Sequence, residues 1–473
     1  MGINTGMTTR LEHDLLGDES LPNSAWYGIQ TLRALRNFNI TGVPIHHFPD
    51  LINTLAMVKE AAAEANFELG ELPPAKYKAI KQACQRIREG ELHDQFVVDL
   101  IQGGAGTSTN MNANEVIANL ALSIMGYEKG QYQYLHPNND VNRSQSTNDA
   151  YPTAARLSIV LSTRALLHSL RSIHKSLEAK AEEFADVLKM GRTQLQDAVP
   201  MTLGQEFKAF SVTLGEDIQR IGEVCNLLCE VNLGGTAIGT GLNTHKDYSR
   251  IAIEHLARIS ELPVVPASNL VEATSDMGAF VSMSSIQKRL AIKLSKICND
   301  LRLLSSGPRA GFNEINLPAM QPGSSIMPGK VNPVIPEAVN QTAFQVMGSD
   351  LTVSMAAEAG QLQLNAMEPV IVYNILNSMK MLTSAIYMLD HRCIRGISAN
   401  KEHCQQQVKD SIGMITALVP YIGYDNASRI ARNALLTRST VGELILKENL
   451  LDEATLNRLL SPSAMLHPMD SLV

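Results

Sequence analysis

Residues 152–188 read PTAARLSIVLSTRALLHSLRSIHKSLEAKAEEFADVL and carry the clearest structural signal in the chain. No proline follows Pro152 in this stretch, so nothing in it breaks a helix interior. Charged side chains occupy one face of the pattern, and it predicts one long amphipathic helix that begins near Pro152, a residue suited to a first helical turn. The apolar residues recur at steps of mostly three or four, the helical period: Leu157, Val160, Leu161, Leu167, Leu170, Ile173, Leu177, Ala181, Phe184 and Leu188.

Four more long proline-free gaps follow, after Pro200, Pro266, Pro336 and Pro369, and each carries the same helical spacing. They predict helices over residues 205–228, 283–304, 335–355 and 371–389. Alternation with a period of two, which would indicate strands, is rare throughout the chain. We therefore predict an all-α fold with a central bundle of long helices. Because one chain with short connections cannot cover such helices, we also expect a homo-oligomer.

The length of 473 residues is too great for one hydrophobic core, and the composition suggests three parts. Residues 1–145 are mixed and mainly helical, with loops rich in Pro, Asn and Gly. Residues 146–395 hold the long helices, together with one loop rich in glycine and proline. Residues 396–473 have the pattern of a small helical domain. We expect three domains with these boundaries.

Composition and charge exclude several classes of protein. The hydrophobic fraction is 45% and the charged fraction 18%, which is typical of a globular chain. The net charge is -7 and no basic block occurs, so a nucleic acid or an anionic membrane is a poor partner. The chain contains no run of about 18 apolar residues, so we expect no membrane span. The first residues lack a basic segment followed by an apolar run, so we expect a cytoplasmic protein.

The six cysteines are few and scattered. Cys225 and Cys229 lie four residues apart in a predicted helix, but no pair of histidines completes a zinc pattern. We therefore expect free, buried thiols of a reducing compartment and no metal site.

Four polar segments interrupt the predicted helices, and polar loops on a rigid scaffold commonly carry function. They are residues 102–112, 136–149, 191–197 and 321–333. The first joins three glycines to hydroxyl and amide side chains, and the second leads into the helix at Pro152, so either could bind an anion through backbone amides. Helix capping, or a simple turn between two helices, explains the first three segments equally well.

The fourth segment, QPGSSIMPGKVNP, is the strongest candidate for an active-site loop. Its glycines and prolines exclude a helix, and a pair of serines and a lysine lie inside it. It is not a phosphate-binding loop, because Gly323 is one residue too far from Gly329 and Val331 follows the lysine. No Gly-x-Ser-x-Gly elbow and no His-Glu-x-x-His motif occurs either. Hydroxyls, amides and one lysine suit the binding of carboxylates and the stabilisation of an oxyanion.

Together the four segments resemble the aspartase/fumarase superfamily. Residues 323–333, GSSIMPGKVNP, look like its signature, and residues 239–244 and 306–311 match it too, so the resemblance covers nearly the whole chain. Residues 102–108, QGGAGTS, are similar to the aspartase branch and differ from typical fumarases. Two further stretches are aspartase-like, VNPVIPE at residues 331–337 and EAGQLQLN at residues 358–365.

The resemblance implies a homotetramer whose core is a bundle of long helices from four subunits. Each active site would take its segments from three different chains. The implied reaction is the reversible elimination of ammonia from L-aspartate to give fumarate. It would pass through an aci-carboxylate, in which the β-carboxylate carries a second negative charge. The resemblance implies no required cofactor and leaves open an effect of a divalent cation such as Mg²⁺.

The resemblance also assigns roles to single residues. Ser324 would be the base, and because a free serine is too weak, closure of the loop must desolvate it and aim donors at its oxygen. The β-carboxylate would be held by Thr107, Ser146, Thr147 and Ser325. The α-carboxylate would be held by Lys330 and Asn332. The amino group would contact Asn148, Thr193 and Gln194.

Two features keep other activities open. Gln194 stands where fumarases and some aspartases have histidine, so a histidine relay is unavailable there. Residues 136–140, HPNND, resemble the secondary dicarboxylate site of fumarases. The alternatives are a class II fumarate hydratase, a lyase of the superfamily with a larger amine substrate, and a non-catalytic scaffold like the lens proteins that reuse this fold. The intact Ser324, Lys330 and Asn332 argue against the last alternative.

Overall fold

A computed structural model describes residues 8–437, 439–461 and 464 of the chain. The chain forms two compact units. Unit 1 comprises residues 1–167, 219–289 and 344–382, and unit 2 comprises residues 168–218, 290–343 and 383–473. The three expected domains were defined by composition along the sequence, whereas these two units are defined by contacts between residues. The units therefore do not test the domain boundaries, which stay a prediction.

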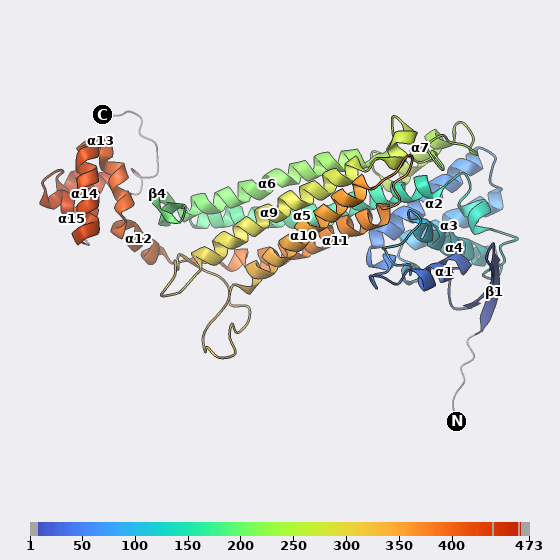
Figure 1. Cartoon of the computed structure of the whole chain (residues 1–473), viewed down its shortest axis with the longest axis horizontal. Coiled ribbons are helices and arrows are strands. Elements are labelled where there is room, and N and C mark those ends of the chain that lie inside the picture. Colours follow the sequence, from blue (N-terminus) through green and yellow to red (C-terminus); the bar gives the residue numbers. More distant parts are fainter. Residues whose placement is uncertain (1–7, 438, 462–463, 465–473) are drawn as a thin grey trace, which may run out of the picture. The chain divides into compact units, whose positions relative to one another are not determined.

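Five long helices dominate the fold, as the proline-free segments predicted (Figure 1). Each contributes residues to both units. Apolar faces of these helices supply many of the fully buried side chains, among them Leu157, Leu214, Leu290 and Ile375. The five helices are α5 (Thr147–Glu183), α6 (Leu203–Leu228), α9 (Gly278–Leu304), α10 (Val334–Glu358) and α11 (Glu368–Arg392).

Helix α2 (Pro49–Glu68) forms the buried centre of unit 1. It packs against α3 (Pro74–Arg88), α4 (Thr107–Ile124) and α7 (Tyr248–Ser260). Pro49 opens the helix, where a missing N–H costs nothing. Most of its side chains are buried, so it is apolar or alanine-rich on several sides rather than on one stripe. Two other parts of unit 1 complete this end of the chain, the hairpin of β1 (Thr9–Asp14) with β2 (Gly17–Pro22) and the helix α1 (Ile29–Asn37).

The start of α5 differs from the prediction. The helix begins at Thr147, so Pro152 lies inside it rather than in its first turn. Proline has no N–H to give to the carbonyl of Asn148, which would be its normal helical acceptor. The side chain of Asn232 donates to that carbonyl instead, at 3.0 Å. The proline is thus compatible with a continuous helix, and the loop around Asn232 is tied to the first turn of α5.

The end of the same helix also differs from the prediction. Helix α5 ends at Glu183, and Leu188 already belongs to strand β3 (Leu188–Thr193), which pairs with β4 (Gln196–Thr202) in an antiparallel hairpin. Of the two alternatives for residues 191–197, the simple turn between two helices is therefore wrong. Gln194 and Leu195 form the two-residue loop, and both have left-handed backbone conformations with φ of 54° and 62°. Such loops normally carry Asn-Gly, and because neither residue occurs here, the residue types do not predict the hairpin.

The C-terminal part of unit 2 is a cluster of short helices with its own apolar core, which includes Leu418, Ile430, Ile445 and Leu456. Thr440 and Glu443 form a capping box at the start of the helix α15, so the local sequence sets where that helix begins. The helices are α12 (Lys401–Asp410), α13 (Val419–Ile422), α14 (Tyr424–Thr437), α15 (Val441–Lys447) and α16 (Glu453–Leu459).

The remaining elements are short. One of them is a π-helical turn, η3 (Pro137–Val141), inside the polar segment 136–149. The others are the helix α8 (Leu270–Ser275), the parallel pair β5 (Glu230–Val231) with β6 (Val265–Pro266), the antiparallel pair β7 (Ile315–Asn316) with β8 (Ser398–Ala399), and the 3-10 turns η1 (Ile45–His47), η2 (His93–Gln95), η4 (Ile394–Gly396) and η5 (Ile412–Leu418).

The six cysteines are all free, as predicted, and five are buried while Cys225 is partly exposed. Among the described residues no helix is both long and apolar enough to cross a membrane.

Candidate active site

The first two polar segments meet in unit 1, where the helices α4 and α5 begin. Thr107 is the first residue of α4 and Thr147 the first of α5. Gly104, Ala105 and Gly106 lead into α4 with φ of 89°, 54° and 91°. A Cβ at Gly106 would lie 2.5 Å from the ring of Tyr151, so only glycine lets the two helix starts approach this closely. The predicted residues at the two starts are therefore neighbours.

Two of these residues are held by local hydrogen bonds. The hydroxyl of Thr107 is exposed and donates to the carbonyl of Gly104 at 2.7 Å, within its own turn. The side chain of Asn148 donates to the carbonyl of Ala237 at 2.8 Å. The Thr107 hydroxyl has one proton and must release the Gly104 carbonyl before it donates to a ligand, whereas the Asn148 amide keeps a second N–H and its oxygen.

Asp149 organises the start of α5, a role that the sequence analysis missed. Its side chain is fully buried and accepts hydrogen bonds from the backbone N–H groups of Ser146, Gly234 and Thr236, at 2.8 to 3.1 Å. Burial raises the pKa of this carboxyl, although the three N–H groups act in the opposite direction. The Ser-x-x-Asp spacing from Ser146 to Asp149 is a capping signal and could have pointed to it.

The fourth segment is a loop of unit 2 that closes on itself. The N–H of Gly323 donates to the carbonyl of Lys330 at 2.8 Å, and the side chain of Asn332 donates to the carbonyl of Gly323 at 2.6 Å. A Cβ at residue 323 would lie 2.4 Å from the Lys330 carbonyl oxygen. The ends of the loop therefore meet at a position that only glycine fits.

Ser324 lies just inside this closure. Its Oγ accepts hydrogen bonds from the backbone N–H groups of Ile326 and Met327, at 3.2 and 3.0 Å. Two donors aimed at one hydroxyl oxygen favour its deprotonated form. Ser325 and Lys330 are exposed, and Lys330 forms no ion pair with any residue that the structure describes. Its charge is free for a ligand.

Thr193 and Gln194 are exposed at the tip of the β3–β4 hairpin, also in unit 2. The strand below them is anchored by buried charge. Glu314 is fully buried and pairs with Arg192 and, at 2.8 Å, with Lys189. The guanidinium of Arg192 also lies 4.3 Å from the centroid of the Phe312 ring.

The predicted site residues thus fall into two groups, one on each unit. Within unit 1 the hydrogen bond from the side chain of Asn110 to Thr147 Oγ, at 3.1 Å, joins the starts of α4 and α5. The unit 1 group contains Thr107, Ser146, Thr147 and Asn148. The unit 2 group contains Thr193, Gln194, Ser324, Ser325, Lys330 and Asn332.

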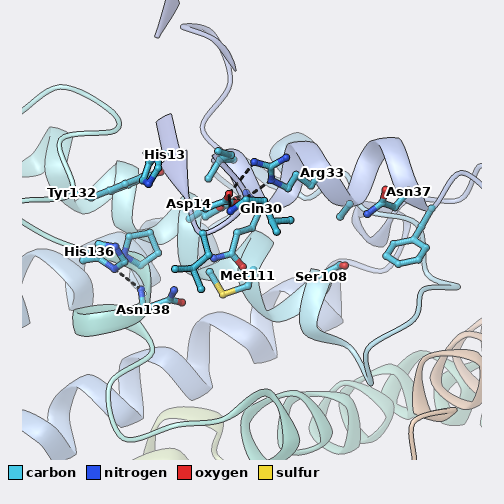
Figure 2. A pocket seen from close by; sticks show the side chains of 17 residues that line it. His13, Asp14, Gln30, Arg33, Asn37, Ser108, Met111, Tyr132, His136 and Asn138 are labelled. Carbon is cyan, nitrogen blue, oxygen red and sulfur yellow. Dashed lines mark hydrogen bonds and ion pairs between the residues drawn. The ribbon is translucent and has the colours of Figure 1, made fainter. Parts of the chain in front are cut away.

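Unit 1 also contains a cavity of about 620 Å³ beside η3, shown in Figure 2. His136 and Asn138 line it, together with Arg33 and Gln30 of α1 and Ser108 of α4. The ring Nδ1 of His136 accepts hydrogen bonds from the N–H groups of residues 138 and 139, at 3.0 and 3.3 Å. Burial lowers the pKa of His136. The likeness of this segment to a second dicarboxylate site stays a prediction.

In the part of the chain that the structure describes, no group of three His, Cys, Asp or Glu side chains is placed to hold a metal ion.

Two family models match the sequence. The lyase family matches residues 17–348, and the family described as the fumarase C C-terminus matches residues 414–467. The aspartate ammonia-lyase of Pseudomonas aeruginosa is 63% identical over 462 residues, which cover 98% of this chain and 98% of the relative. That of Escherichia coli K12 is 55% identical over 460 residues, which cover 97% of this chain and 96% of the relative.

Solved structures agree with these matches. A fumarate lyase:delta crystallin from Brucella melitensis, bound to cobalt, has a TM-score of 0.95 and 57% identity, and the alignment covers 98% of this chain and 100% of that one. The class II fumarase of Schistosoma mansoni has a TM-score of 0.91 and 36% identity, with coverage of 97% and 99%.

Proposed function

The chain belongs to the lyase family of the aspartase/fumarase superfamily, and we propose that it catalyses the reversible elimination of ammonia from L-aspartate to give fumarate. The observation that carries the proposal is 63% identity, over 98% of both chains, to a relative named aspartate ammonia-lyase. The fold alone would not decide the substrate, because one scaffold hosts several chemistries.

The two groups of polar residues suit the two carboxylates of this substrate. We assign the β-carboxylate to Thr107, Ser146 and Thr147 of the unit 1 group and to Ser325, because α4 and α5 both begin at these unit 1 residues and helix N-termini favour negative charge. The α-carboxylate is assigned to Lys330, whose charge has no partner among the described residues, and to Asn332. The amino group is assigned to Asn148, Thr193 and Gln194.

Ser324 is the proposed base. It takes a proton from the carbon beside the β-carboxylate, and the electron pair of that C–H bond moves onto the carboxylate, which becomes the aci-carboxylate. The N–H groups of residues 326 and 327 stabilise the charge on the serine oxygen before it reacts. The electrons then return to form the carbon–carbon double bond as the C–N bond breaks. Because the amine of aspartate is an ammonium ion at neutral pH, it leaves as neutral ammonia.

One assay tests the activity. Purified protein is incubated with L-aspartate or with L-malate, and the absorbance of fumarate is followed. We expect turnover of L-aspartate. Activity on L-malate alone would overturn the proposal in favour of a fumarate hydratase, the activity named for the 36% identical relative from Schistosoma mansoni. Turnover of neither substrate would favour a lyase with a larger amine or a non-catalytic scaffold.

We further propose a homotetramer. Phe344, Leu351 and Met355 lie on one face of α10 at spacings of seven and four residues, and each is more than 60% exposed in the single chain. An apolar stripe at helical spacing fits burial against another subunit. Light scattering coupled to size exclusion would report four chains, and a monomer of full activity would contradict the proposal.

Two remaining assignments are also proposals. We assign no cofactor to the reaction, and turnover that is lost on treatment with a chelator and restored by Mg²⁺ would contradict this. We assign the protein to the cytoplasm, where its six free cysteines would stay reduced.

A further inference from the structure

Lys59 of α2 is a buried charge that the proposed mechanism does not use. Its side chain is completely buried, and its Nζ donates to three amide oxygens, those of Asn110 at 2.7 Å, Gln145 at 2.8 Å and Asn142 at 2.9 Å. It forms no ion pair within the described residues. Burial lowers the pKa of Lys59 to about 7, but three acceptors within 2.9 Å are satisfied together only by the protonated amine.

The ammonium fixes which way these amides face. An ammonium has three donors and no acceptor, so each amide must turn its oxygen toward it. The nitrogen of the Asn110 amide is then directed to the other side, where it donates to Asn142 at 3.1 Å and to Thr147 Oγ at 3.1 Å. Lys59 therefore determines that Thr147 Oγ is the acceptor in its hydrogen bond with Asn110.

A hydroxyl that accepts a hydrogen bond is left with one donor to place elsewhere. No described residue accepts a hydrogen bond from Thr147 Oγ, and the residue is partly exposed at the first position of α5. Its proton is consequently available to a ligand at the start of this helix. A carboxylate accepts hydrogen bonds and does not donate them, so a hydroxyl held as a donor matches it.

We propose that Lys59 is a positioning residue, which acts through the Asn110 amide to hold the Thr147 hydroxyl as a hydrogen-bond donor to the substrate carboxylate. The proposal rests on the assignment of Thr147 to that carboxylate. It requires only that a carboxylate binds there, so it applies equally to elimination from L-aspartate and from L-malate. We call the hydrogen bonds from Lys59 to Asn110 and from Asn110 to Thr147 the relay. The buried ammonium polarises the relay so that the Thr147 hydroxyl becomes a stronger donor, which suits a carboxylate that gains negative charge.

The test reverses the relay without removing Lys59. The substitution Asn110→Asp keeps the shape of the side chain and its contact with Lys59, but it replaces the N–H donor to Thr147 with an acceptor. The Thr147 hydroxyl must then donate to Asp at residue 110 and is lost to the substrate. Because the new carboxylate faces an ammonium, the variant is expected to fold, and thermal unfolding checks this. The assay uses whichever of the two substrates the wild-type enzyme converts.

We expect Asn110→Asp to lower kcat/KM by about 10- to 100-fold, the effect of one hydrogen bond to a charged group. In a Thr147→Val background the hydroxyl is already absent, so the same substitution should change kcat/KM by no more than about twofold, which is within the usual scatter of double-mutant cycles. In a Thr147→Ser background, which keeps the hydroxyl, the full loss should return. An equal loss in the valine and wild-type backgrounds would overturn the relay, because a general effect of charge or structure does not depend on the hydroxyl.

A second cycle addresses Lys59 itself. Lys59→Met keeps the length of the side chain and removes its donors, and its loss of kcat/KM should likewise vanish in the Thr147→Val background. If the losses of kcat/KM from Lys59→Met and from Thr147→Val multiply in the double variant, Lys59 acts on folding or on another group. Should Lys59→Met fail to fold, the Asn110→Asp cycle still decides the proposal. Near-wild-type activity of Thr147→Val would overturn the proposal and the Thr147 assignment, while leaving elimination from L-aspartate in place.

Discussion

At the scale of the residue, Gly323 and Ser324 determine the proposed chemistry of the loop over residues 321–333. Glycine lets the loop close, because no other side chain fits against the Lys330 carbonyl oxygen. Closure in turn leaves the Ser324 oxygen facing two backbone N–H groups. The loop is thus a folded turn with an internally hydrogen-bonded serine and not an open linker.

Replacing Gly323 with alanine should therefore reduce turnover strongly and affect stability little. The added Cβ would meet the Lys330 carbonyl oxygen at 2.4 Å and force the ends of the loop apart. The loop is largely exposed, so we expect the free energy of unfolding to fall by less than about 1 kcal/mol. Gly329→Ala is the comparison, since no atom lies within 4 Å of its added Cβ and the variant carries only the backbone strain of a φ of 81°, without a clash. Equal losses of turnover in the two variants would contradict this role for Gly323.

Residue types and spacing could predict which loop carries the chemistry, but not the hydrogen bonds that prepare it. Glycine, proline, two serines and a lysine within residues 323–333 were enough to single out the loop and to reject a phosphate site. The buried Lys59 gave no signal, because a single lysine in an apolar helix resembles any surface lysine until its neighbours are known. The part played by Asp149 was missed in the same way, although the capping pattern was present.

At the scale of the element, proline placement predicted the long helices well, because a helix interior tolerates almost no proline. It was less reliable at their ends. Helix α5 contains Pro152, since a side-chain donor replaces the missing N–H bond, and the helix ends before Leu188 because the chain turns into a hairpin. Both differences from the prediction depend on contacts between segments that are distant in the sequence. The spacing of residues within one segment cannot predict such contacts.

The hairpin tip offers a prediction at this scale. Leu195 has a φ of 62°, in a region that costs a residue with a Cβ about 1–2 kcal/mol. Leu195→Gly should therefore leave the unfolding temperature unchanged or raise it slightly, whereas Leu195→Val should lower it, because a β-branched residue is worst in this conformation. Because the loop also orients Gln194, the valine variant should raise KM for the substrate. Indistinguishable unfolding temperatures and KM values for the two variants would argue against the left-handed loop.

At the scale of the whole molecule, the proposed site residues divide between unit 1 and unit 2. Sequence similarity to the superfamily predicted that each active site draws on several chains, and the exposed apolar stripe on α10 supports an oligomer. The sequence could predict the set of residues but not which copies of the chain supply them. That information depends on how subunits assemble, which no single segment of the chain contains.

A complementation experiment tests the shared sites. Two variants are made, Ser324→Ala in the unit 2 group and Thr147→Val in the unit 1 group. Each homo-oligomer should have strongly reduced turnover. When the two chains are unfolded together and refolded as a mixture, some sites receive an unaltered segment from each chain, so part of the activity should return. A mixture no more active than its components would indicate that each site is built from one chain.

The central claim is that Ser324 is the base, and its most direct test separates that role from the cap that the serine provides to residues 326 and 327. Ser324→Asn keeps an oxygen that can accept the same two N–H groups, but it offers no hydroxyl to act as a base. Ser324→Ala removes both. The measurement is kcat for L-aspartate, with KM recorded alongside. We predict that kcat falls by at least about 1,000-fold in both variants while KM changes far less. Turnover near the wild-type value in Ser324→Asn would show that the serine only shapes the loop.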